Sequence, residues 1–481
     1  MDGGGGVSAR LHGCRHACRT GGLIPMREVT FQSLTRRAEI GANCYVLDTG
    51  RARIALDSGM HPKERAFDAL PDFPLCPDGS LDAVVVTHSH LDHVGSLPVL
   101  MRRNLRAPAY MSPVTAEFAE ALLHNSVNVM SAQREQEGIK EYPLFTHREL
   151  DGLVRRWEGR QPGRIFELAE TGVRAEFFDA GHLPGSVGVR LNVDGLTIFY
   201  TGDVHFEDQT ILKKAEFPID PVDVLVLECT RGAAERNPDY SREAESKRFA
   251  AMISRALERG GSVLIPVFAL GKTQEILMML HELKGRGLVP MDAPVHIGGL
   301  STRMTQIVDR HTNDVRRHHA GFRILESLHG LVKSKKGERI SSSHPGRIYA
   351  LSSGMMTEKT VSNEFAYHFI NRPENALCFV GYADPDSPAG QILASAPGAL
   401  VPLDSVFPPV PLNCEVGQFD FSGHAPRHEL IDYARRLNPR KILLVHGDGP
   451  ALDWMAKALS LAVPECEVII PLPGEKVVLA R

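Results

Sequence analysis

Three histidines and one aspartate are crowded into the segment THSHLDH, residues 87–93, directly after the apolar run DAVVV. Imidazole nitrogens and carboxylate oxygens are typical zinc ligands, so this segment can bind metal ions. Alternate positions such as His88 and His90 point the same way in an extended segment, whereas Asp92 and His93 follow the turn and can face a second ion. The alternative is a histidine-rich loop that contacts only solvent, because a short motif has false positives.

Ligand-type residues also follow three further apolar runs. His182 lies in the glycine-bounded segment DAGHLPGS, Asp203 follows TIFY, and His446 follows KILLV. A single histidine after a strand is more often a packed or capping residue. Four strand ends that all carry ligand types are hard to explain by packing alone, so together they indicate a shared metal centre.

Short apolar runs and longer helical segments supply the elements that must position these residues. The segments 43–50, 52–59 and 82–86 predict strands that end in loops. The segments 114–136 and 242–260 predict helices, the second of which ends in Gly-Gly. This alternation is typical of α/β layers.

Composition limits the classes of function. The chain has 481 residues, 23% of them charged, and a net charge of −4, which fits two or three domains without the basic surplus of a polyanion-binding protein. The eight cysteines form no C-x-x-C pair, so reduced thiols in a cytoplasm are expected. Residues 1–25 have no secretory apolar core and predict a disordered extension ahead of Met26, and the Pro-rich segment 402–413 indicates a connector.

The order of these pieces resembles the metallo-β-lactamase superfamily. LDSG resembles its first motif, HSHLDH its second, GHLPGS its third and YTGDV its fourth. Later pieces resemble the β-CASP branch, RNA-processing nucleases of the cleavage and polyadenylation endonuclease type: DVLVLECTRG resembles motif A, FDFSGHAPRHEL motif B and LLVHGD motif C. IPVFALGKTQEIL and LSSGMMT resemble segments of the domain that is inserted in this branch. The resemblance covers residues 27–481.

The resemblance implies an α/β fold, an αββα metallo-β-lactamase sandwich with an inserted β-CASP α/β domain. It assigns residues 26–230 to the first part of the metallo-β-lactamase domain, 231–420 to the β-CASP insert and 421–481 to the part that completes the first domain. The cleft between the two domains is then expected to hold the substrate. A narrow cleft admits a single strand better than a duplex, because it cannot accommodate two backbones.

The family pattern also assigns the metal ligands. One zinc is expected to take His88, His90, His182 and Asp203, and the other to take Asp92, His93, Asp203 and His446, with Asp203 bridging. Asp57 is expected to orient the groups that bind the metals; the alternative is a turn carboxylate that bonds nearby backbone amides.

These roles imply a mechanism for phosphodiester hydrolysis. Two cations about 3.5–4 Å apart lower the pKa of a bridging water and neutralise charge on the phosphate oxygens. His424 of motif B is the expected general acid for the leaving alkoxide, since its unperturbed pKa is about 6.5. Glu228 of motif A is expected to hold His424 oriented and protonated; the alternative is a carboxylate in a surface ion pair. The implied function is a zinc-dependent ribonuclease.

Departures from the family pattern fall in the insert and not at the metal ligands. The segment GYADPDSPAGQ carries two acids, Asp384 and Asp386, where the family has a basic end. These changes call the binding of the substrate into question more than its hydrolysis. Lys272, Ser352 and Ser353 are still expected to contact phosphates, or else are ordinary polar loop residues.

The expected partners are single-stranded RNA and a second copy of the chain in a homodimer, with no membrane contact and a cytoplasmic location. Basic stretches at 316–323 and 333–339 are either a nucleic-acid patch or ordinary solvated faces. Two rival functions stay open. A hydrolase of thioesters or lactones on the same metal core is favoured if the insert has no basic groove. A non-catalytic scaffold of an RNA-processing complex is favoured by lost metal ligands, but every ligand position is filled.

Overall fold

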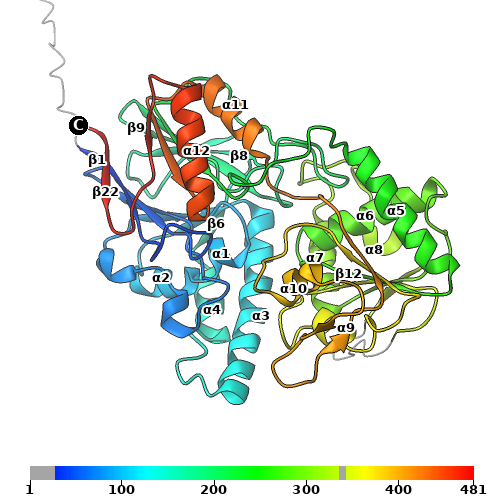
Figure 1. Ribbon diagram of the computed structural model, residues 1–481. Helices are drawn as coiled ribbons and strands as arrows, with labels where there is room; N and C mark the ends of the chain where they lie inside the picture. The colour runs from blue at the N-terminus through cyan, green and yellow to red at the C-terminus, as the bar shows by residue number, and fades with distance from the viewer. Residues whose placement is uncertain (1–27, 335–342) are drawn as a thin grey trace, which may run out of the picture.

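Two seven-stranded sheets pack face to face and form one lobe of the molecule (Figure 1). The computed structural model describes residues 28–334 and 343–481. The first sheet consists, in spatial order, of β22 (Lys476–Ala480), β1 (Val29–Ser33), β2 (Tyr45–Asp48), β3 (Arg53–Leu56), β4 (Ala83–Val85), β5 (Ala109–Met111) and β6 (Trp157–Gly159). The second consists of β21 (Glu467–Ile469), β20 (Lys441–Val445), β11 (Val224–Glu228), β10 (Leu196–Tyr200), β9 (Val187–Val193), β8 (Arg174–Asp179) and β7 (Ile165–Glu167).

Helices cover the outer face of each sheet. α2 (Leu97–Arg103), α3 (Pro113–Glu137) and α4 (His147–Val154) pack on the first sheet, and α11 (Arg427–Leu437) and α12 (Gly449–Ala462) pack on the second. The inner faces meet in a separate apolar core. β11 is buried throughout, because it lies between β10 and β20, which explains its continuous apolar sequence. The lobe is therefore an αββα sandwich, as the sequence predicts.

A third sheet forms the second lobe, the insert. Its strands are all parallel and run, in spatial order, β14 (Leu331–Lys333), β13 (Val295–Ile297), β15 (Ile348–Leu351), β12 (Val263–Pro266), β16 (Ala376–Phe379) and β19 (Glu415–Gln418). One face is covered by α5 (Arg242–Glu258), α6 (Lys272–Gly285), α7 (Gly299–Arg310) and α8 (Ile324–Ser327), and the other by α9 (Val361–Ala366) and α10 (Pro388–Ala394). The predicted α/β fold class is thus confirmed for the insert as well.

The connection between the lobes explains how the site is assembled. β11 and β20 pair in parallel, with Glu228 opposite Val445, although the whole third sheet lies between them in the sequence. In parallel sheets, loops at the carboxyl ends of the strands form ligand sites. On the insert these loops follow β12, β15 and β16, and they face the sandwich.

The structure contradicts one expectation from the sequence, and two others lie wholly or mostly outside the described residues. The Pro-rich segment 402–413 is not a connector between domains, because it belongs to a hairpin of β17 (Leu400–Val401) and β18 (Val410–Pro411) that packs on the insert core through Leu403 and Leu412. The extension 1–25 lies outside the described residues, as does most of the basic stretch 333–339. Across the parts of the chain that the structure describes, no helix is long and apolar enough to cross a membrane.

Candidate metal centre

The histidine-rich segment follows the end of a buried strand. β4 ends at Val85, and the short helix α1 (Leu91–Val94) begins directly after His90. His88 and His90 therefore extend from the loop, whereas Asp92 and His93 extend from the first turn of α1. The loop and the helix turn can thus present ligands to two neighbouring positions.

Ligand-type side chains from several strand ends meet in three groups. Within each group, one nitrogen or oxygen atom per residue lies within 4.8 Å of the others. The groups are His88, His90, His182 and Asp203; then Asp92, His93 and His446; and finally Asp203, Glu228 and His424. The structure thus brings together every residue that the sequence proposed as a metal ligand or a proton donor.

Asp203 lies between the first two groups. Its Oδ2 is 3.5 Å from Nε2 of His88 and 3.6 Å from Nε2 of His182. Its Oδ1 is 3.4 Å from Nε2 of His93, which is in turn 3.3 Å from Nε2 of His446. Two ligand atoms about 2.1 Å from one tetrahedral ion lie about 3.4 Å apart, so the donor spacing fits cations on both sides of Asp203.

Burial and charge at the site also fit bound cations. Nε2 of His88 and Oδ1 of Asp203 are buried and have no hydrogen-bond partner among the described residues. Burial, together with the neighbouring histidines, lowers the pKa of His88 and of His182 well below the usual value, so both are neutral and offer a lone pair. Burial also opposes charge on His93, but the carboxylates of Asp203 and Asp57 raise its pKa to about 10. Such a field of carboxylates favours positive charge at this place.

The second nitrogen of two histidines is held by the protein. Nδ1 of His182 donates to the carbonyl oxygen of Gly423 at 2.8 Å, and Nδ1 of His446 is 2.9 Å from Oγ1 of Thr230. Metal-binding histidines are usually fixed in this way, since the outer bond sets the tautomer and the ring orientation. No pattern in the sequence indicated a role for Thr230, which follows Glu228 by two residues in DVLVLECTRG.

Asp57 contacts the site through His93. Its carboxylate accepts hydrogen bonds from Nδ1 of His93 at 2.8 Å, the backbone N–H of Thr87 at 2.7 Å and the hydroxyl of Tyr200 at 2.7 Å. Its φ of 59° is rare for a non-glycine residue, and such strain is often found at functional sites. Asp57 therefore makes the backbone contact of the turn alternative and also orients a group of the centre. The sequence predicted no role for Thr87 or Tyr200. Thr87 directly precedes His88, and Tyr200 begins the segment YTGDV.

His424 and Glu228 form a buried pair beside the centre. Nδ1 of His424 is 3.3 Å from Oε1 of Glu228, which also accepts from the backbone N–H of Val204 at 2.8 Å. Burial opposes both charges, yet His424 lowers the pKa of Glu228 to about 2, and Glu228 raises the pKa of His424 above its usual value. Glu228 is 1% exposed, which excludes the surface ion pair. The ring of His424 lies 4.5 Å from that of His182, so an imidazole whose charged form Glu228 favours lies next to the ligands.

The expected phosphate contacts lie outside the three groups. Nζ of Lys272 donates to the carbonyl oxygen of Phe421, and burial lowers its pKa to about 8. Lys272 thus supports the segment that leads to His424. Ser352 and Ser353 begin the loop after β15, where the Ser353 hydroxyl accepts from the backbone N–H of Thr357 at 3.1 Å.

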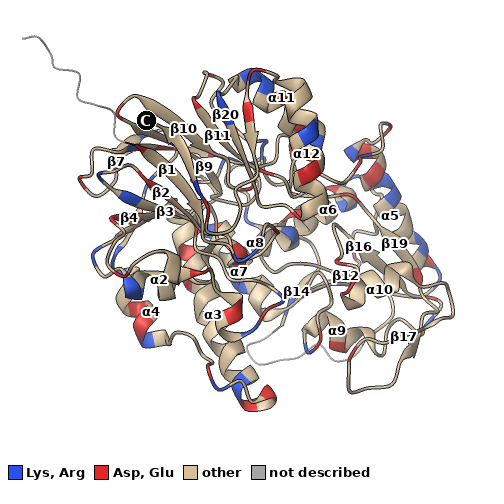
Figure 2. Cartoon of the chain, turned by 60° about the vertical axis from the view of Figure 1, so that its left-hand side comes forward, with Lys and Arg blue, Asp and Glu red and all other residues tan. Residues whose placement is uncertain are grey.

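The basic stretch 316–323 lies between the lobes and is largely engaged there. Arg316 pairs with Glu216 of the sandwich at 2.9 Å, and Arg317 is 4% exposed. Figure 2 shows Lys and Arg positions interspersed with Asp and Glu positions along the ribbon of both lobes. This stretch therefore does not offer the isolated basic patch that one interpretation of the sequence suggested.

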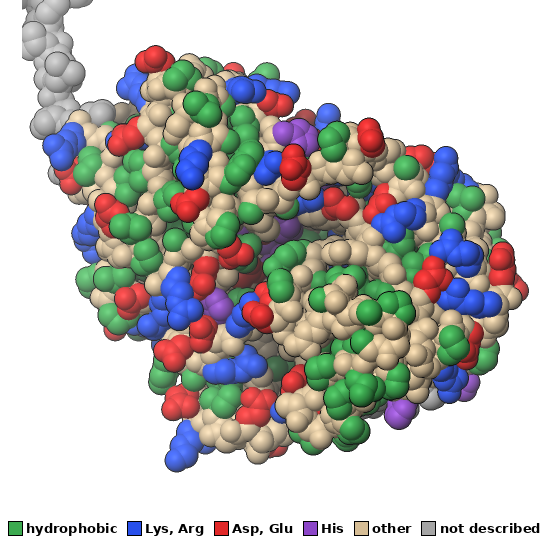
Figure 3. Space-filling view, in the orientation of Figure 1, with side chains coloured by type: hydrophobic (Ala, Val, Ile, Leu, Met, Phe, Trp, Pro, Cys, Tyr) green, Lys and Arg blue, Asp and Glu red, His purple; other side chains and the backbone are tan. Residues whose placement is uncertain are grey.

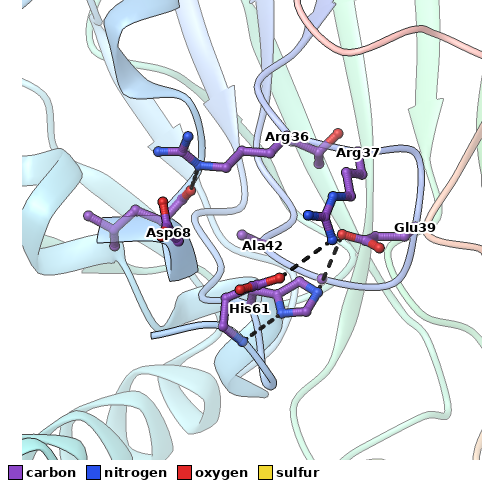
Figure 4. Close-up of a pocket in the computed structure, with 10 residues that line it drawn as sticks. Arg36, Arg37, Glu39, Ala42, His61 and Asp68 are labelled. Atoms are coloured by element: carbon purple, nitrogen blue, oxygen red, sulfur yellow. Dashed lines mark hydrogen bonds and ion pairs between the residues drawn. The ribbon is translucent and has the colours of Figure 1, made fainter. Parts of the chain in front are cut away.

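The hollow between the lobes is visible from the outside. In the space-filling view, histidine side chains are visible deep in a hollow between the sandwich and the insert (Figure 3). A separate cavity of about 330 Å³ lies in the sandwich, next to Arg37, Glu39 and His61 (Figure 4). Its charged groups pair with one another, since His61 is 3.4 Å from Glu39 and Arg37 is 3.4 Å from Glu64. None of the residues in the three ligand groups lines this cavity, so it is distinct from the metal centre.

Known families match three segments of the chain in the expected order. Residues 38–253 match the metallo-beta-lactamase superfamily, residues 273–392 the Beta-Casp domain, and residues 409–471 a Zn-dependent metallo-hydrolase RNA specificity domain. A solved structure of a protein of unknown function from Enterococcus faecalis has a TM-score of 0.56 over 94% of this chain and all of that one, with 14% identity. At this identity the likeness concerns the fold alone.

Curated relatives support the same assignment. Transcription termination factor FttA of Pyrococcus abyssi is 29% identical over 85% of this chain and 65% of its own length. Probable RNase MJ4 of Methanocaldococcus jannaschii is 28% identical over 85% of this chain and 91% of its own length. Cleavage and polyadenylation specificity factor 73 of Drosophila melanogaster is 28% identical over 88% of this chain, which spans only 60% of that protein. The chain therefore belongs to the β-CASP branch of the metallo-β-lactamase superfamily, whose members are metal-dependent.

Proposed function

We propose that the chain is a zinc-dependent nuclease that hydrolyses single-stranded RNA. The observation that carries this proposal is the third group, in which a charged His424, paired with buried Glu228, lies directly beside the ligand cluster. A scaffold protein has no need of a buried proton donor at such a place. The ribonuclease names of relatives such as Probable RNase MJ4 agree with this substrate.

The proposal includes two zinc ions per chain. One is assigned to His88, His90, His182 and Asp203, and the other to Asp92, His93, Asp203 and His446, with Asp203 shared. When bound, the ions supply positive charge that activates water and offsets the charge of the phosphate oxygens. The contribution of Asp57 is to hold the ring of His93 in place, so that its Nε2 faces the second position.

His424 has the role of general acid. The leaving 3′-oxygen of an RNA chain is a poor leaving group and needs a proton. The carboxylate of Glu228 keeps the imidazole charged and in a fixed orientation, and its bond to Val204 fixes the carboxylate in turn. The segment before His424 is held by Lys272 through Phe421.

The insert supplies the second wall of the substrate cleft. Its loops after β12, β15 and β16 face the sandwich, and hydroxyls such as those of Ser352 and Ser353 are suited to contact phosphates. The limited space between two lobes favours a single strand over a duplex.

The decisive experiment compares substrates with and without metal. Purified protein is incubated with end-labelled single-stranded RNA and DNA, before and after removal of metal by a chelator and after addition of zinc. We expect RNA cleavage that the chelator abolishes and zinc restores, with about two zinc ions per chain by elemental analysis. Hydrolysis of thioesters or lactones without cleavage of either nucleic acid would replace this proposal with a small-substrate hydrolase.

A further inference from the structure

The insert contacts the sandwich on two sides that are built differently. On one side, Val114, Phe118 and Leu212 of the sandwich are buried within the insert's apolar core. On the same side, the carboxylate of Glu275 accepts from the backbone N–H of Thr210 at 2.8 Å. Apolar packing and buried hydrogen bonds of this kind hold the two lobes together.

On the other side, the lobes touch through a partly exposed ion pair. Nζ of Lys63 in the sandwich is 2.6 Å from Oδ2 of Asp384 and 3.9 Å from Oδ2 of Asp386, both in the loop before α10 of the insert. The Lys63 side chain is 57% exposed. The helices α3 and α7 of the packed side overlap α10 in the view of Figure 1 but lie clearly apart from it in the turned view of Figure 2. The Asp384 side chain is 15% exposed, so the pair as a whole is partly exposed. A single ion pair in contact with solvent contributes little to stability, so this side can open while the packed side holds.

Both ends of the ion pair are fixed in place. The backbone N–H groups of Lys63 and Glu64 each donate to Nδ1 of His61 at 3.1 Å, and Nε2 of His61 faces Glu39 at the wall of the cavity (Figure 4). On the insert, Oδ1 of Asp384 accepts from the backbone N–H of Asp386 at 2.9 Å. These bonds order the backbone that carries Lys63 and the turn that carries Asp384, so the two side chains start from defined positions.

A series of contacts links the segment that carries Lys63 to the metal centre. Gly41 packs against the ring of His61, and its carbonyl oxygen accepts from the backbone N–H of Asn43 at 3.0 Å. The same N–H is 3.0 Å from the carbonyl oxygen of Asp92, a member of the second ligand group. A short series of contacts thus links the segment that carries Lys63 to the second ligand group.

We propose that Lys63, Asp384 and Asp386 form a bar across the open side of the cleft that selects which part of an RNA chain can enter. The proposal rests on the proposed nuclease function. A chain end or a small ester can reach the centre by threading, whereas an internal segment has chain on both sides and must pass sideways through the bar. The two aspartates outnumber the lysine, so the closed bar is also net negative and repels phosphates.

The test uses two neutral substitutions with opposite effects on charge. Lys63→Met removes a positive charge, and Asp384→Asn removes a negative charge while keeping an oxygen acceptor for Asp386. Each breaks the bar, so both should raise the ratio of cleavage of circular to linear single-stranded RNA of the same sequence. We expect a rise of about twofold to fivefold, the factor that loss of a partly exposed ion pair implies. The double variant should add nothing, because each single change already removes the contact.

Two controls separate entry from chemistry. Bis(4-nitrophenyl) phosphate is small enough to enter a closed cleft, so its hydrolysis should not change in either variant. Lys359→Met breaks an ion pair of 2.9 Å with Glu137 that joins α3 to the insert away from the bar, and it should leave the circular-to-linear ratio unchanged.

Carbodiimide treatment, which condenses an amine and a carboxylate into an amide as the reagent takes up water, should yield a Lys63–Asp384 cross-linked peptide from the wild type.

The outcomes are distinct. An unchanged ratio in both variants, with RNA still cleaved, overturns the bar alone. Opposite changes in the two variants would show that only charge matters and would also overturn it. Absence of the cross-linked peptide would show that the bar does not close in solution. If the wild type hydrolyses the small ester but cleaves neither RNA, the proposed function fails, whatever the cross-link shows.

Discussion

The two walls of the cleft are built from different kinds of contact. On the sandwich wall, buried side chains at strand ends are fixed by further buried groups, as His93 is by Asp57. On the insert wall, the loops carry partly exposed polar residues such as Ser353 and Asp384, which bond mostly to their own turns. The sandwich wall therefore tolerates little change, whereas the insert wall can vary without loss of the fold. This explains why the departures from the family pattern gather on the insert.

The largest effect is expected at the residue shared by the ligand groups. Asp203→Asn keeps the shape but removes the charge that faces four histidines. Hydrolysis of both RNA and an aryl phosphodiester should fall by several orders of magnitude, with loss of bound zinc in elemental analysis. Asp220→Asn, at an exposed aspartate of the same lobe, serves as the control. If Asp203→Asn retained wild-type activity, the hydrolytic step could not be assigned to the sandwich wall.

A smaller and more selective loss is expected for the proton donor. His424→Ala should slow RNA cleavage by at least about 100-fold while metals stay bound. An aryl phosphodiester has a phenolate leaving group that needs little help, so its hydrolysis should change much less. Cleavage of RNA at the wild-type rate by this variant would show that the general acid is another group.

The next effect concerns the partner of the donor. Glu228→Gln keeps an oxygen acceptor for Val204 but removes the charge that protonates His424. We expect a loss of RNA cleavage on the order of tenfold, smaller than for His424→Ala, because the imidazole remains but its charged form is less favoured. The double variant with His424→Ala should be no slower than His424→Ala itself, since the glutamate acts through the histidine. Additive losses would mean that Glu228 has a separate role.

The smallest effect is expected where the insert wall supports the sandwich wall. Lys272→Met removes the bond to Phe421 and should lower kcat for RNA by about threefold, through slight misplacement of His424. KM should stay unchanged, because the buried ammonium is engaged with the protein. Steady-state kinetics distinguish the two roles. A rise in KM with constant kcat would show that Lys272 contacts a phosphate of the substrate and does not position His424.

The sequence was most informative where one short segment carries many ligand types. THSHLDH predicts a metal site by chemistry alone, and the strand ends at His182, Asp203 and His446 add to it. The local pattern was enough for the helix α3 and the buried strand β4, which match the expected segments 114–136 and 82–86, because local propensity and burial agree there. These features depend on neighbours in the sequence.

Other features depend on residues that are distant in the sequence. No local pattern indicates that Lys63 meets Asp384, or that Tyr200 bonds Asp57. The Pro-rich segment was misread for a similar reason, since Leu403 and Leu412 become a hairpin face only once the insert core exists. Contacts between the lobes depend on the folded surfaces of both lobes. The periodicity of apolar residues along the sequence gives no information about them.

The pairing of β11 with β20 has a consequence for synthesis on the ribosome. The second sheet cannot close, and His446 cannot join its group, until the entire insert has emerged and folded. Every shorter nascent chain lacks one ligand of the set. The order of residues along the gene thus delays assembly of the complete centre until nearly the whole protein has been made.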